Sequence, residues 1–182
     1  GFENYLGPTN APLLGERGRL RRDERYGARN LDPYLQASWQ LAERWRVEGG
    51  VRRADVRFAS DDRYITASNG DDSQSARYRR WLPTAALRFE ASPALALYAA
   101  AGRGFETPTL NELAYRAGGA AGANFGLQPA SSTSLELGLK ARLGGGLLTA
   151  ALFQTGTKNE IVTLTNVGGR STFQNAGRTR RR

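Results

Sequence analysis

The strict alternation of apolar and polar side chains over residues 132–143 is the feature that most limits what this chain can fold into. In the stretch STSLELGLKARL, the odd positions carry mostly leucine and the even positions carry mostly serine, glutamate, lysine and arginine. A period of two is that of a β-strand whose two faces meet different surroundings. Residues 34–41 and 77–91 repeat the pattern. We therefore expect an all-β, antiparallel protein.

Weaker alternation predicts further strands, which brings the total to about seven, with no convincing helix. These additional strands are expected over residues 45–59, 95–104, 147–162 and from about 171 to the end of the chain.

The connections between these strands alternate between short and long. In an up-and-down sheet, such alternation places every short turn at one end and every long loop at the other, as in a transmembrane β-barrel. The short turns are expected at 42–44, 92–94 and 144–146, and the long connections at 60–75, 104–131 and, somewhat shorter, 164–170.

Aromatic residues lie where a membrane interface would place them. Trp39 and Trp45 flank the first short turn, and Phe89 precedes the second. Trp81 shares a strand face with Phe89 at a distance of roughly 26 Å along the strand, or about 19 Å along the membrane normal for a tilted strand. The apolar belt of such barrels is about 25 Å tall. We expect this face to contact lipid through Trp81, Leu87, Phe89, Leu135, Leu137 and Leu139.

A soluble β-sandwich is the alternative, because any half-buried sheet alternates in the same way. Two aromatic rims with an uncharged span between them favour the barrel. The opposite face would then line a lumen, where charges of both signs can pair between strands. We predict lumen-facing or plug-facing positions for Arg80, Arg88, Glu90, Glu136 and Lys140.

Composition removes most catalytic functions. The chain has 182 residues and contains no cysteine and no histidine, which excludes thiol nucleophiles, serine–histidine dyads and most transition-metal sites. No spacing argues for a pair of converging carboxylates. We expect no catalytic residue, no metal site, no cofactor and no enzymatic activity.

The net formal charge of +9 comes almost entirely from arginine. Nucleic-acid binding would place aromatic and basic residues together on one face, but here they occupy mostly opposite faces. We therefore expect no nucleic-acid partner.

The stretch GRGFETPTLNELAYR, residues 102–116, marks the end of an apolar strand. Pro108 removes a backbone donor and ends strand pairing, and TLNELAYR is expected to form a short helical turn over the rim. Residues 104–131 are then expected to be a mobile, ligand-gathering loop. Within it, Tyr115 and Arg116 are candidate contacts for an anionic or aromatic chelate.

Three stretches carry a family resemblance: YAAAGRGFETPTLNELAYR, NFGLQPASSTSLELGLK and NAGRTRRR. They resemble barrel strands of TonB-dependent outer-membrane receptors, and the resemblance covers most of residues 30–182. Ala130 departs from the pattern, since relatives often carry glutamate there.

The resemblance implies a transmembrane β-barrel of about 22 strands, of which residues 1–182 are expected to be a part, with the plug domain outside this chain. It implies active import of a scarce nutrient, foremost an iron–siderophore complex, across the outer membrane of a Gram-negative bacterium. The TonB protein would supply energy through segments outside this chain. A passive porin or a structural barrel is the alternative.

Overall fold

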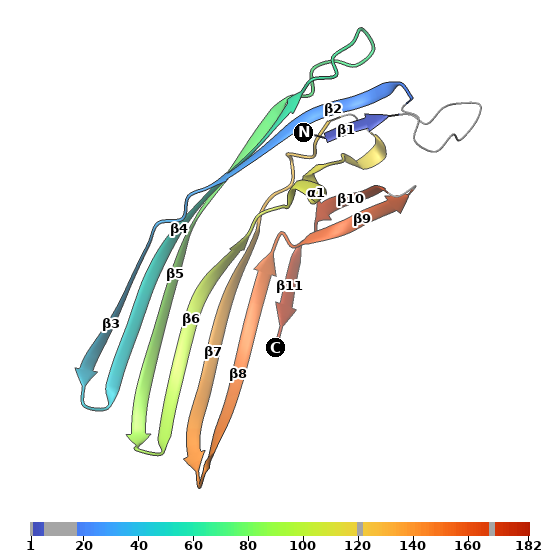
Figure 1. Ribbon diagram of the computed structural model, residues 1–182. Coiled ribbons are helices and arrows are strands. Elements are labelled where there is room, and N and C mark those ends of the chain that lie inside the picture. The colour runs from blue at the N-terminus through green and yellow to red at the C-terminus, as the bar shows by residue number, and fades with distance from the viewer. Residues whose placement is uncertain (1, 6–17, 120–121, 168–169) are drawn as a thin grey trace.

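The fold is an open, curved antiparallel sheet, seen in a computed structural model that describes residues 2–5, 18–119, 122–167 and 170–182. Nine strands form the main sheet and two form a smaller one. Figure 1 shows the long strands side by side, with their tight turns at one end. The strands are β1 (Phe2–Tyr5), β2 (Leu20–Asn30), β3 (Tyr34–Ala42), β4 (Trp45–Asp62), β5 (Gln74–Ser92), β6 (Leu95–Glu106), β7 (Ala130–Leu143), β8 (Gly146–Lys158), β9 (Ile161–Val167), β10 (Arg170–Asn175) and β11 (Arg178–Arg181).

The strand order is that of an up-and-down meander. The main sheet runs β1-β2-β4-β5-β6-β7-β8-β11, and β3 also pairs with β4. Three tight turns join β3 to β4, β5 to β6 and β7 to β8. Gly144, in the last of these turns, has φ +60°, which favours glycine. The predicted antiparallel fold and the three short turns at one end are confirmed.

The structure contains more and shorter strands than we expected from the sequence. Residues 20–30 form β2, which the charged sequence LRRDERYGARN concealed. β2 and β3 both pair with β4, and the pairing is interrupted around Pro33, between the end of β2 and the start of β3. The single strand expected over 147–162 is β8 followed by β9, because Asn159 adopts φ +57° between them. The expected loop over 164–170 instead belongs largely to the β9–β10 hairpin, and the expected last strand is split into β10 and β11.

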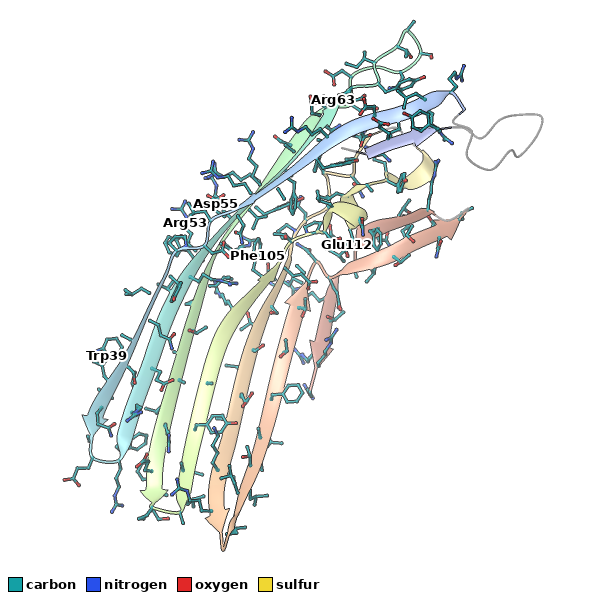
Figure 2. All side chains as sticks on the ribbon, in the orientation of Figure 1. Trp39, Arg53, Asp55, Arg63, Phe105 and Glu112 are labelled. Atoms are coloured by element: carbon teal, nitrogen blue, oxygen red, sulfur yellow. The ribbon has the colours of Figure 1, made fainter. Side chains whose placement is uncertain are left out.

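The two faces of the sheet differ in chemistry, and we call them the outer and inner faces. The outer face carries Leu87, Leu137 and Leu152, which lie in one cross-strand row. The inner face is the one on which the connection between β6 and β7 packs, through Phe58 and Tyr78. Figure 2 shows Trp39, Arg53 and Asp55 on one side of the sheet, and Glu112 near the other.

The connection between β6 and β7 is a packed element. Thr109 and Glu112 form a capping box that begins the short helix α1 (Leu110–Leu113). Leu113 is completely buried and joins Phe58, Tyr78 and Leu127 in the largest buried apolar cluster of the described residues.

Hydrogen bonds fasten this connection to the sheet. The Tyr78 hydroxyl donates to the Leu127 carbonyl over 2.9 Å, and the Asn124 amide side chain donates to the Phe173 carbonyl over 3.2 Å. The predicted helical turn is thus confirmed. The connection is shorter than the expected 104–131, because residues 104–106 belong to β6 and residues 130–131 belong to β7. That it is mobile and gathers a ligand stays a prediction.

Candidate functional site: the inner face and its outer mouth

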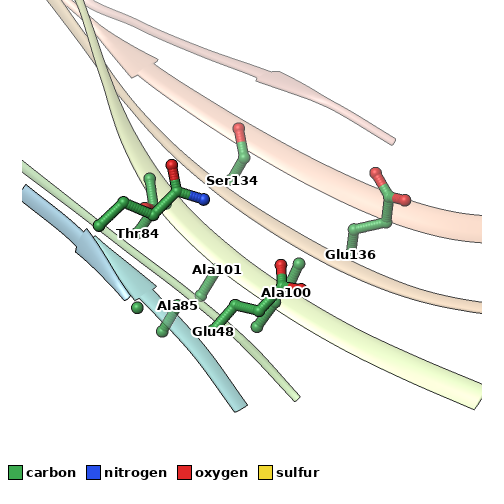
Figure 3. Close-up of a pocket in the computed structure, with 11 residues that line it drawn as sticks. Glu48, Thr84, Ala85, Ala100, Ala101, Ser134 and Glu136 are labelled. Atoms are coloured by element: carbon green, nitrogen blue, oxygen red, sulfur yellow. The ribbon is translucent and has the colours of Figure 1, made fainter. Parts of the chain in front are cut away.

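The middle of the inner face is a shallow hollow between two carboxylates. Glu48, Ala86, Ala100 and Glu136 form one row across β4, β5, β6 and β7. The two alanines leave open a volume of about 350 Å³, which Gln36, Thr84 and Ser134 also line. Figure 3 shows Glu48 and Glu136 on either side of Ala100. The row therefore offers an acidic, sterically open surface.

A tyrosine fixes one of these carboxylates. The Tyr98 hydroxyl donates to Glu136 Oε1 over 2.6 Å, and the Lys140 ammonium lies 5.8 Å from the centre of the Tyr98 ring. Tyr98 faces Gly138 across the strands, and any Cβ at Gly138 would clash with the ring. The structure thus brings together two of the residues predicted to face the lumen, Glu136 and Lys140.

The other predicted lumen residues lie on the same face without forming one cluster. Arg88 and Glu90 form an ion pair at 3.1 Å, but both side chains are half exposed, so the pair adds little stability. Arg80 is exposed and has no hydrogen bond or ion pair with any residue that the structure describes. That these residues contact a plug stays a prediction.

At the end of the sheet away from the tight turns, Tyr115 lies between two guanidinium groups. Arg22 of β2 lies 5.1 Å from the centre of the Tyr115 ring, and Arg170 of β10 lies 5.4 Å from it. Such cation–π contacts contribute about 0.5–1 kcal/mol when exposed. The ring thereby links β2 of the main sheet to β10 of the smaller sheet.

Arg116, the second predicted contact residue, is engaged within its own loop. Its Nε donates to the Ala123 carbonyl over 3.0 Å, and the side chain is partly buried. Arg170 is the exposed cation that the sequence analysis missed. No sequence pattern pointed to it, since only the folding of β10 toward α1 brings it beside Tyr115. Whether Tyr115 or Arg116 touches a ligand stays a prediction.

Arg22 belongs to a second network. It donates from Nη2 to Glu24 over 2.8 Å, to the Tyr26 hydroxyl over 2.7 Å and to the Ala114 carbonyl over 3.1 Å. The Tyr26 hydroxyl also donates to Glu24. Burial, reinforced by this bond to Glu24, raises the pKa of Tyr26 to about 12. Tyr26 pairs with Ser60, well beyond the level of Trp81 and Arg53, so the network lies outside the predicted membrane span.

The described part of the chain offers neither a metal site nor a membrane-spanning helix. Within it, no group of three or more carboxylates is placed to hold a metal ion. No helix among the described residues is both long and apolar enough to cross a membrane.

Comparison with known proteins identifies the family. The family description "TonB dependent receptor-like, beta-barrel" matches residues 2–182. The chain belongs to the TonB-dependent receptor family. This family is one of receptors, and the matched part is its β-barrel.

Several solved structures share the fold. The ferric-catecholate import receptor Fiu from E. coli aligns with a TM-score of 0.64 at 18% identity, covering 90% of this chain and 26% of that receptor. The ferric yersiniabactin uptake receptor FyuA from Yersinia pestis gives 0.62 at 20% identity, covering 85% and 23%. The copper transporter OprC gives 0.65 at 19% identity, covering 82% and 24%. This chain spans about a quarter of the length of these receptors.

The Tyr26 network predicts a loss of stability in alkali. In the unfolded chain the hydroxyl has a pKa of about 10, whereas the folded protein holds the proton up to about pH 12. Between these pH values the unfolded state binds fewer protons than the folded state, so the free energy of unfolding falls as the pH rises. The stabilisation by the protonated Tyr26 hydroxyl is fully present below this window.

Tyr26→Phe should therefore flatten the pH dependence of urea unfolding in this window. Tyr34→Phe is the matched control, because Tyr34 is 77% exposed and should leave the slope unchanged. An identical slope in Tyr26→Phe and the unaltered protein would contradict the role assigned to Tyr26.

Proposed function

We propose that these residues are part of an outer-membrane receptor that actively imports a scarce nutrient into a Gram-negative bacterium. The observation that carries the proposal is the outer face of the sheet. Large apolar side chains follow one another from strand to strand there, with Leu137 62% and Leu152 80% exposed. Soluble proteins rarely expose a contiguous apolar surface of this extent, whereas lipid accommodates it.

Aromatic side chains border this surface toward both ends, which supports a membrane location. Trp45 and Phe89 face each other in register near the tight turns, with ring centres 4.5 Å apart. Trp81 lies toward the other end and is exposed on the same face. Between Phe89 and Trp81 this face of β5 carries only Leu87, Ala85 and Pro83. We therefore place lipid against the outer face, including the predicted residues Leu135 and Leu139.

The inner face would then contact a plug domain outside this chain, with residues 1–182 forming part of the barrel. Glu48 and Glu136 offer acceptors on either side of the hollow above Ala86 and Ala100. Arg80, Arg88, Glu90 and Lys140 add charges of both signs. A plug surface with small loops and basic side chains would fit this hollow. Energy from TonB would reach the barrel through the plug.

We infer an iron–siderophore complex as the most favoured cargo. Two of the similar structures are a ferric-catecholate import receptor and a ferric yersiniabactin uptake receptor. An anionic or aromatic chelate would complement the exposed Arg170 beside the Tyr115 ring. The packing of the β6–β7 connection onto the inner face favours such a gated receptor over an open passive porin.

Charge placed on the outer face tests the membrane location. Leu152→Arg should lower insertion into the outer membrane, because arginine on a lipid-facing strand costs free energy, up to roughly 2–4 kcal/mol at the midplane and less toward the interfaces. Phe153→Arg is the matched control, since Phe153 is the next residue on β8 and pairs with Glu136 on the inner face. Insertion is measured by heat-modifiable gel mobility of the receptor that carries these residues. Equal insertion of both variants would contradict the proposal.

The proposed ligand contacts are tested by binding. Tyr115→Ala and Arg170→Gln should each weaken binding of a ferric catecholate by about tenfold, because each removes a charge-assisted or cation–π contact. Arg63→Gln removes an exposed charge at another loop, where the Arg63 side chain forms an ion pair with Asp61 at 3.6 Å, and this variant should bind normally. Titration of the purified receptor by fluorescence quenching reports the dissociation constant. Unchanged binding in both Tyr115→Ala and Arg170→Gln would place the ligand elsewhere.

A further inference from the structure

Three arginines stand directly beside one another on the outer face. Arg29 of β2 pairs in register with Arg57 of β4, and Arg57 pairs with Arg77 of β5. Neighbouring strands are about 4.8 Å apart, and like charges directly opposite each other destabilise a sheet. We call these three residues the arginine row. A row of this kind needs a negatively charged partner.

Among the described residues, Asp55 is the carboxylate that contacts the row. Asp61 shares the outer face further along β4 but pairs with Arg63. Asp55 accepts two bonds from Arg77, at 2.7 Å from Nε and 2.6 Å from Nη2, and lies 3.6 Å from Arg79. Its side chain is only 14% exposed, so it has little room for other partners. The side chains of Arg29 and Arg57 are exposed and have no hydrogen bond or ion pair within the described part of the chain.

The arginine row begins where the apolar surface ends. The pairing of β4 with β5 has no register shift, so Trp81, Arg79 and Arg77 lie on one face in succession. Arg53 pairs with Trp81, and its guanidinium lies 5.5 Å from the centre of that ring. Together with Arg53 and Arg79, the row and Asp55 carry a net formal charge of +4. From Trp81 to Arg77 the rise is about 13 Å along the strand, or about 9 Å along the membrane normal for a strand tilted by roughly 45°. The row therefore lies near the polar layer, about 5–8 Å deep, that borders the hydrocarbon core.

The row also borders a hollow that combines charged and apolar walls. Arg29, Arg57 and Arg77 line a volume of about 210 Å³ together with Leu31 and Asp55. Leu31 is exposed. An occupant with a phosphate for the guanidinium groups and a hydrocarbon part for Leu31 would complement both walls.

We propose that the arginine row binds phosphate groups of anionic lipid headgroups in the leaflet next to the β2–β4–β5 end of the barrel. Guanidinium groups bind phosphate oxygens in a planar, bidentate manner, and a phosphate between Arg29 and Arg57 removes their mutual repulsion. The inference rests on the membrane location proposed above. It adds a lipid site on the outside of the barrel, separate from the inner face and the ligand mouth.

Thermal unfolding of the whole receptor in vesicles tests the site. The probes are vesicles of phosphatidylcholine alone and of phosphatidylcholine mixed with phosphatidic acid, and a third arm adds inorganic phosphate to the first vesicles. A lipid that binds only the folded protein raises its melting temperature. We expect the unaltered receptor to melt at a higher temperature with phosphatidic acid, less so at high salt, and not with inorganic phosphate.

Two variants test whether the arginine row causes the stabilisation by phosphatidic acid. Arg29→Gln/Arg57→Gln should abolish most of the stabilisation by phosphatidic acid, while Arg80→Gln, which removes the neighbouring inner-face charge on β5, should retain it. No stabilisation of the unaltered receptor, or an equal loss in Arg80→Gln, would overturn the proposal. An equal effect of inorganic phosphate would also overturn it, in favour of a small-anion site. Failure of the unaltered receptor to enter vesicles would instead refute the membrane location itself.

Discussion

The hydrogen-bonded register between β4 and β5 determines which side chains lie on each face of the sheet. It runs without a shift from the pair Trp45 and Phe89 to the pair Ser60 and Gln74. Because side chains in a strand alternate between faces, one residue of slip would exchange the faces along the whole strand. The apolar surface, the aromatic borders and the arginine row on one side, and the acidic hollow on the other, all depend on this register.

Packing and one buried charge network order the inner face. The Arg88–Glu90 ion pair is half exposed and weak, whereas Leu113 and Leu127 bury apolar surface against Phe58 and Tyr78. The Arg22–Glu24 pair is largely buried, and Arg22 also donates to the Ala114 carbonyl of the β6–β7 connection. This packing holds the β6–β7 connection over the sheet and carries Tyr115 to its place between Arg22 and Arg170.

The sequence predicted the long strands and the tight turns because period-two patterns and glycine or proline at turns are local signals. It also predicted that Pro108 ends β6 and that a short helix follows, since the capping residues Thr109 and Glu112 are only three positions apart in the sequence. It missed β2, because LRRDERYGARN shows little apolar alternation and is fixed as a strand by its pairing with β4. The partners of Tyr115 and the arginine row were missed for a related reason, since both arise from register between segments distant in sequence.

The central claim is that lipid covers one face of the sheet and that the other faces the barrel interior. A cysteine scan tests it most directly, because this chain has no cysteine of its own. Each position from Ser134 to Leu139 is replaced in turn, labelled with a fluorophore in reconstituted receptor, and exposed to lipid-soluble and water-soluble quenchers. We expect the lipid-soluble quencher to reduce the fluorescence of labels at positions 135, 137 and 139 and to have no effect on labels at 134, 136 and 138. Quenching without alternation, or alternation in the opposite phase, would contradict it.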